Sequence, residues 1–143
     1  MKKAQSLIIQ FVIFFMIGFT LFLTIGTFLK ARSDIFREET LNYGMVGVSS
    51  YVSSLAINLF DYCKQCDFVR TSFRIENVTA GYFFELEFLN AGKGLRVLAL
   101  PGGKYHISSI HNLNSSLLLS GKSISLKTIT LTFDKTKNEL RIE

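Results

Sequence analysis

Two cysteines, Cys63 and Cys66, are the residues whose type and spacing are best suited to chemistry. A pair with this spacing can form a disulfide, act as a redox centre of the thioredoxin kind, or supply two ligands to zinc. A thioredoxin-like centre needs a strand-to-helix context, and no such context precedes Cys63. If the chain is exported, a disulfide is the first expectation, and two free buried thiols are the alternative.

Histidines and carboxylates are the other candidate groups. His106 and His111 are the only histidines, and they stand on either side of a predicted loop, which does not favour a zinc site with the cysteines. Glu85 and Glu87 share one face of a predicted strand, where we expect solvated carboxylates and no acid–base pair. Because no nucleophile, base and orienting acid can be assembled, we predict that the protein is not an enzyme and uses no cofactor or metal.

Two triplets match the acceptor sequence for asparagine glycosylation. They are Asn77-Val-Thr79 and Asn114-Ser-Ser116, and both fall in predicted turns. Chance alone gives about one such triplet in a chain of this composition, so the pattern supports glycosylation only weakly. Asn77 and Asn114 are therefore glycosylation candidates if the domain that carries them is outside the cell.

A long apolar run precedes all of these groups. Leu7 to Leu29 contains no charged residue, and a helix of about 23 residues is roughly 35 Å long, enough to cross about 30 Å of hydrocarbon. A cleaved secretory signal has a shorter apolar core that ends in small residues, whereas Lys30-Ala31-Arg32 follows this run. Two interpretations remain open: an uncleaved signal anchor, and a leader that is cut on the cytoplasmic side of the run so that the helix is retained.

Charge sets the orientation of this segment. Lys2 and Lys3 precede the run, whereas basic and acidic residues cancel after it. The positive-inside rule therefore keeps the short N-terminal end in the cytoplasm and places the remainder outside the cell. Within the run, Gln10 lies early, within reach of the membrane interface, and Thr20, Thr24 and Gly26 are small or weakly polar positions that would let another helix approach closely. Alternatively, the threonines bond to their own helix and face lipid.

A second helical pattern follows the apolar run. Its apolar residues alternate at spacings of four and three, which is typical of an amphipathic helix with one buried face. They are Leu41, Met45, Val48, Val52, Leu55 and Leu59. The pattern predicts a nearly continuous helix from about Ser6 to about Phe60, with Gly44 and Gly47 as candidate positions for a bend. The alternative is a membrane helix, a short break and an independent core helix.

The period changes from 3.6 to 2 after Asp67, which predicts β-strands. Alternation is clear at 69–75, 84–88, 105–108 and 140–142, and residues 95–100 form a nearly continuous apolar strand. Ile124 and Leu126 are expected to face one way, out of phase with Ile129, Leu131 and Phe133, so a bulge or turn is predicted near Lys127. Six or seven short strands predict an α+β fold with a small antiparallel sheet or sandwich.

Composition supports this organisation. The chain has 143 residues, of which 48% are hydrophobic and 19% charged, which fits a spanning helix with one folded domain and argues against disorder. The net charge is +5, but basic residues are interspersed with acidic ones. Nucleic-acid binding is therefore not expected.

The extreme N-terminus resembles a known processing signal. Lys2-Lys3-Ala4-Gln5, directly before the apolar run, is similar to the class III signal peptide of archaeal type IV pilins and archaellum subunits. The resemblance implies that a prepilin peptidase cuts between Ala4 and Gln5 and leaves the helix on the mature protein. The sequence departs from the family pattern at its fifth mature position, which is Ile9 where pilins often have glutamate.

The resemblance also implies a domain organisation. Residues 1–4 would be the leader, 5–30 the transmembrane and filament-core helix, 31–62 its amphipathic continuation, and 63–143 an extracellular β domain. The protein would be a structural subunit of a type IV pilus-like filament, held in the cell membrane before assembly and packed against copies of itself or other pilin-like subunits afterwards. The positions named above, from Gln10 to Leu59, would form the assembly helix.

Two other functions stay open. The chain could be a single-pass, membrane-anchored β-domain protein that acts as an accessory or minor component of a pilus or archaellum machine. It could also be a surface-bound binding module that uses Tyr82, Phe83 and Tyr105, although such aromatic residues more often belong to a core.

Overall fold

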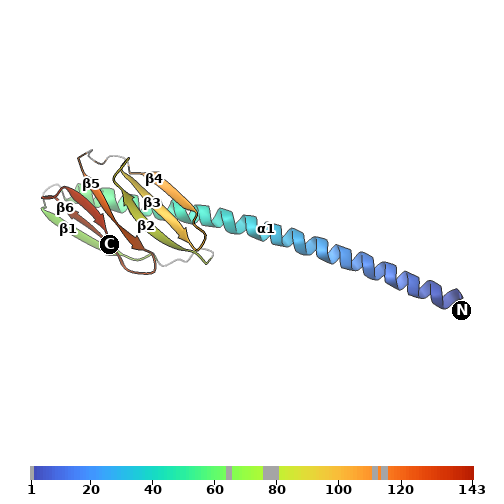
Figure 1. Ribbon diagram of the computed structural model, residues 1–143. Coiled ribbons are helices and arrows are strands. Elements are labelled where there is room, and N and C mark those ends of the chain that lie inside the picture. The colour runs from blue at the N-terminus through green and yellow to red at the C-terminus, as the bar shows by residue number, and fades with distance from the viewer. Residues whose placement is uncertain (1, 64–65, 76–80, 111–112, 114–115) are drawn as a thin grey trace. The chain divides into compact units, whose positions relative to one another are not determined.

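A computed structural model describes the chain except for residues 1, 64–65, 76–80, 111–112 and 114–115. It has one long N-terminal helix followed by strands, the α+β arrangement that the sequence predicts (Figure 1). The elements are α1 (Lys2–Tyr62), β1 (Phe68–Phe73), β2 (Phe83–Leu89), β3 (Gly94–Leu100), β4 (Tyr105–Ser109), β5 (Leu118–Ile124), β6 (Ile129–Asp134) and β7 (Glu139–Ile142).

The chain divides into two compact units at a point inside the helix. Within Met1–Glu38 the described residues are helix alone, and Glu39–Glu143 holds the second part of α1 together with every described strand. The prediction of one continuous helix is confirmed, and the alternative of a break followed by an independent core helix is wrong. Glycine weakens a helix by about 1 kcal/mol per residue, and packing of neighbouring apolar residues on the sheet offsets that cost.

The described strands form a seven-stranded sheet in the order β1-β6-β7-β5-β2-β3-β4. Every neighbouring pair is antiparallel except β5 and β7, which are parallel. The sheet form of the predicted fold is therefore confirmed, and the sandwich form is wrong. The parallel pair is a feature that the alternating sequence pattern does not reveal, because alternation gives the faces of a strand and not the direction of its neighbour.

The predicted break in phase before Ile129 is a turn. Lys127 N–H donates to the carbonyl of Ile124 at 3.1 Å, and this turn joins β5 to β6. Leu126 lies in that turn with its side chain exposed, so the expectation that it shares a strand face with Ile124 is wrong. The strand before the turn starts earlier, at Leu118.

One face of the sheet and one face of α1 share the hydrophobic core of the second unit. Burying a leucine, valine or phenylalanine side chain stabilises a fold by about 1.5–3 kcal/mol, so this shared core holds the helix to the sheet. The helix supplies Leu41, Met45, Val52, Ala56 and Leu59, and the sheet supplies residues that include Phe84, Leu86, Leu95, Val97, Leu131, Phe133 and Leu140.

One polar contact and one glycine add to this packing in the second unit. Ser49 on α1 is buried, and its hydroxyl is hydrogen-bonded to the hydroxyl of Ser108 on β4. Gly121 on β5 has φ = 97°, and a Cβ at that position would overlap the carbonyl oxygen of Ile142 on β7. Glycine is therefore required where β5 and β7 run side by side.

Candidate functional site

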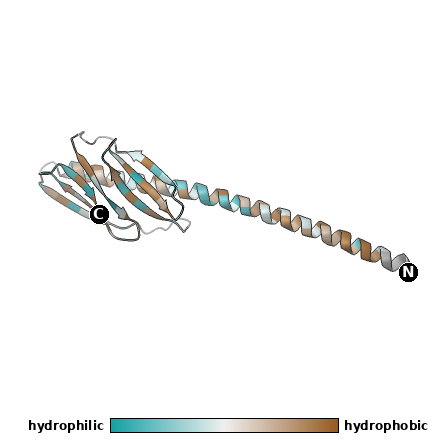
Figure 2. Ribbon diagram, viewed as in Figure 1, coloured by the Kyte–Doolittle hydropathy of each residue, from teal (hydrophilic) through white to brown (hydrophobic). Residues whose placement is uncertain are grey.

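The apolar part of α1 is the feature of the first unit that needs a partner. From Leu7 to Leu29 its large side chains are exposed all round the helix, between 50% for Leu23 and 73% for Phe14. Figure 2 shows the same stretch coloured as hydrophobic. α1 is long and apolar enough to cross a membrane by length and composition. So large an apolar surface calls for lipid or for other apolar helices around it.

The threonine hydroxyls inside this stretch are satisfied by the helix itself. Thr20 Oγ1 donates to the carbonyl of Met16 and Thr24 Oγ1 donates to that of Thr20, both at 2.8 Å. This is the arrangement in which threonine is tolerated in lipid. Gln10 is exposed, and a Cβ added at Gly26 would meet no atom within 4 Å, so the helix surface is open at both positions.

The amphipathic residues of α1 pack against the sheet, whereas the apolar stretch is exposed. Leu41, Met45, Val52 and Leu59 are buried against the sheet, and Val48 and Leu55 are partly buried there. These six residues attach the helix to its own domain. The protein's own sheet therefore covers most of their surface, and of the predicted assembly positions only Gln10, Thr20, Thr24 and Gly26 are exposed.

Cys63 and Cys66 stand where the helix gives way to the sheet. The structure joins them as a disulfide with Cα atoms 4.7 Å apart, and Cys63 is buried. The Cα separation lies within the range of disulfides in proteins. The bond closes the chain directly after the last turn of α1, so it holds the helix end next to the start of β1.

Several sequence-predicted sites fall outside the described residues. The backbone of Lys2, Lys3, Ala4 and Gln5 lies in α1, but their side chains are not described. Both glycosylation candidates, Asn77 and Asn114, also lie outside the described residues, as does His111.

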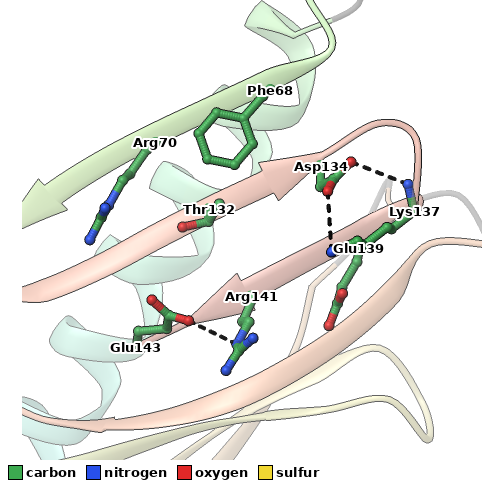
Figure 3. Close-up of a pocket in the computed structure, with 8 residues that line it drawn as sticks. All are labelled: Phe68, Arg70, Thr132, Asp134, Lys137, Glu139, Arg141 and Glu143. Carbon is green, nitrogen blue, oxygen red and sulfur yellow. Dashed lines mark hydrogen bonds and ion pairs between the residues drawn. The ribbon is translucent and has the colours of Figure 1, made fainter.

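A charged hollow of about 240 Å³ lies on the face of the sheet that is turned away from α1. β1, β6 and β7 supply most of its lining, and the turn before β7 completes it (Figure 3). The lining residues are Phe68, Arg70, Thr132, Asp134, Lys137, Glu139, Arg141 and Glu143. Opposite charges pair within it: Arg141 Nε lies 3.0 Å from Glu143 Oε1, and Lys137 Nζ lies 3.7 Å from Asp134 Oδ2.

Asp134 in this hollow accepts hydrogen bonds that lower its pKa. A hydrogen bond from the Thr136 hydroxyl is the main reason that the pKa of Asp134 lies below its ordinary value of 3.8. The backbone N–H groups of Thr136 and Lys137 also donate to its Oδ1, at 3.0 and 3.2 Å. The carboxylate thus organises the turn between β6 and β7.

The central strands carry a second set of ion pairs. Glu85 on β2 lies 2.9 Å from Lys122 Nζ on β5, and Glu87 pairs with Arg96 on β3. The expectation of solvated carboxylates is wrong for Glu85, whose side chain is only 11% exposed. A strand with neighbours on both sides shields a carboxylate that alternation alone would place in water.

Sequence reasoning missed the charged hollow because its residues come from three separate strands. Arg70, Asp134 and Arg141 each occupy an outward position of an alternating strand, which is the only signal that the sequence contains. Within the described part of the chain, no group of three or more His, Cys, Asp or Glu residues could hold a metal ion. No protein-family model, no curated protein and no solved structure matches this chain.

Proposed function

We propose that this protein is a structural subunit of an extracellular filament of the archaeal type IV pilus kind. The observation that carries the proposal is that the two halves of α1 have different surroundings. Residues 7–29 expose apolar side chains on all sides, whereas residues 41–59 bury one face against the protein's own sheet. A helix that is fixed to a folded domain at one half and unpartnered at the other is suited to join copies of the domain.

The proposed assembly begins from the membrane. Before assembly, α1 lies in lipid with the sheet domain outside the cell, and afterwards the apolar stretch packs among the same stretch of sister subunits. Lipid tails are as apolar as leucine side chains, so this transfer gains little from the hydrophobic effect itself. Close packing of side chains therefore supplies the specificity, and the open surface at Gly26 allows the close approach of a second helix.

The character of the sheet supports this arrangement. The face turned away from α1 carries the ion pairs of Arg141 with Glu143 and of Glu85 with Lys122. Charged side chains on that face suit contact with water and not with lipid. The proposed partners are copies of this chain or other pilin-like subunits, the membrane before assembly, and the prepilin peptidase.

Intact-mass measurement of the protein from its native cells tests the processing step. We expect the mature chain to begin at Gln5 and to lack the mass of Met1 to Ala4. A variant with Lys2→Gln and Lys3→Gln removes the basic pair that the peptidase would recognise and should keep its N-terminus. A native protein that retains Ala4 would contradict the proposal.

Electron microscopy of material sheared from the cell surface then tests polymerisation. Filaments that contain this chain would support the subunit role. The alternative is a membrane-anchored accessory component, and the presence of Ile9 where pilins often have glutamate favours it. Processed chain that stays in the membrane fraction, with no filaments, would select that alternative.

A further inference from the structure

The two edges of the sheet differ in charge. β1 and β4 are the terminal strands, and no described strand pairs with the outer side of either. An unpaired edge is a template for another strand unless charged side chains, prolines or bulges oppose pairing. β1 carries Arg70 at an outward-facing position, whereas β4 runs Tyr-His-Ile-Ser-Ser with no acidic or strongly basic residue.

The ladder between β3 and β4 shows which backbone groups of β4 do not bond to β3. Ala99 N–H donates to Lys104 O, and Ile110 N–H donates to Lys93 O, both at 2.8 Å. In an antiparallel ladder the bonded pairs alternate, so the even-numbered residues of β4 bond to β3. The N–H and C=O groups that point away from the sheet belong to the odd-numbered residues Tyr105, Ile107 and Ser109.

We propose that β4 is a self-pairing edge, on which two copies of this chain join antiparallel with Ile107 opposite Ile107. This register places Tyr105 of each copy opposite Ser109 of the other. It is the one antiparallel register in which all the outward groups of the three residues bond across the contact, six hydrogen bonds in all by the alternation rule. A shift by one residue would bring outward groups opposite inward ones and lose the bonds.

Side chains support the same register. Ile107 is 51% exposed and Tyr105 63% exposed, and both lie on the sheet face turned away from α1. Pairing places the two isoleucines side by side, with each tyrosine diagonal to the partner's isoleucine and within reach of it. The same contact through β1 would be centred on Arg70 and would set two guanidinium groups opposite each other, which opposes pairing there.

The contact is small, because it joins two strands of five residues each. Its area lies at the low end for specific interfaces, below roughly 1,200 Å², so a single pair is weak. Where many copies stand side by side on one surface or polymer, multivalency strengthens such contacts by a large factor. The pairing therefore suits lateral association between arrays of this chain. It uses only the sheet domain, so it does not depend on polymerisation through α1.

Cysteine cross-linking of the full chain in detergent tests the register. Among the described residues no cysteine is free, so an introduced cysteine supplies the reactive thiol. Facing residues of a bonded antiparallel pair have Cα atoms about 5.5 Å apart, which a disulfide can bridge. Under mild oxidation we expect I107C to form dimers at least about tenfold faster than L118C, an exposed matched control on β5, because pairing raises the effective thiol concentration.

A mixing experiment separates this register from any other contact. Y105C mixed with S109C should give the mixed dimer at a rate similar to that of I107C. Either variant alone should cross-link no faster than L118C, because its two thiols lie four residues apart along the strands. Dimers of Y105C alone that form as fast as the mixed dimer would overturn the proposal, as would equal rates for I107C and L118C.

A charge substitution provides a second measurement. In I107K the two like charges face each other, so the dimer fraction measured by sedimentation in detergent should fall at least about fivefold. I107T keeps a β-branched residue at the same position and should retain most of the dimer. Near-ultraviolet circular dichroism checks that both variants fold. A folded I107K that dimerises as well as the natural chain would overturn the proposal whether or not filaments exist.

Discussion

Gly121 shows how one residue permits the central pairing of the sheet. Its φ of 97° is in the left-handed region, and the carbonyl oxygen of Ile142 occupies the space that a Cβ would need. Gly92, in the turn before β3, also has a positive φ of 79°, but a Cβ there would meet no atom within 4 Å. Alanine at Gly92 would therefore add backbone strain alone, whereas alanine at Gly121 would add both backbone strain and steric overlap.

We predict that G121A destabilises the domain far more than G92A does. Positive φ alone costs alanine about 1–2 kcal/mol, which is the expected loss for G92A. G121A adds an overlap with backbone, so its loss should be about 3 kcal/mol or more. Thermal unfolding of the full chain in detergent, followed by near-ultraviolet circular dichroism, measures both. Equal losses would show that β7 moves aside at little cost.

At the residue level, the sequence predicts faces better than neighbours. The six apolar residues of the amphipathic pattern all face the core, from Leu41 to Leu59, because a helical period specifies a buried face directly. Alternation within one strand predicts that Glu85 is solvated, but its burial depends on β3 and β5, which lie on either side of its strand. The charged hollow was missed for the same reason, since its strands are neighbours only in the folded sheet.

The contact between α1 and β4 depends on an isolated polar pair in an apolar interface. Ser49 is 1% exposed, and its hydroxyl bonds to that of Ser108. Removal of one hydroxyl leaves the other without this bond, which costs about 1–3 kcal/mol for a buried group. Removal of both leaves no polar group to satisfy.

We therefore predict that S49A and S108A are not additive. Each single variant should lose about 1–2 kcal/mol of unfolding free energy, and the double variant should lose no more than either single one. Chemical denaturation of the four proteins gives the coupling energy. The variant S54A, on the exposed side of α1, is the control and should change stability little. Additive losses from S49A and S108A would show that the two hydroxyls act independently.

At the level of elements, β-strand positions follow from alternation, but the order of strands does not. The strand of residues 118–124 gave a weak signal because it contains Ser120, Gly121 and Lys122 in its middle. The parallel pairing of β5 with β7 requires β6 to lie beyond β7, and no local pattern encodes that crossover. The turn before β6 was predictable because the apolar phase changes across it.

At the level of the whole molecule, the first unit and the second unit should respond independently to mutation. An arginine near the centre of a membrane helix costs about 2.5–3.5 kcal/mol of insertion free energy. Phe19 lies near the middle of the apolar run, and Tyr43 is an exposed aromatic residue on α1 within the second unit. The two positions allow a matched pair of substitutions on one helix.

We predict that F19R lowers the fraction of the chain that resists alkaline extraction from membranes, whereas Y43R does not. Neither substitution should change the thermal unfolding of the sheet domain, because neither side chain contributes to its core. Extraction of both variants from the same cells, with an immunoblot of the pellet, measures the difference. If F19R stayed in the membrane pellet like the natural chain, the proposed role of residues 7–29 would be contradicted.

The place of β7 in the sheet affects the order in which the protein can be completed. β7 is the last of the described strands along the chain, yet it lies between β5 and β6 and is the only strand that joins β1 and β6 to the other four. During synthesis, the β1-β6 pair and the β5-β2-β3-β4 group therefore cannot join into one sheet until residues 139–142 have been made. Until that strand arrives, the inner edges of β5 and β6 remain open to wrong partners. A chaperone that covers exposed strand edges would have its greatest effect in that interval.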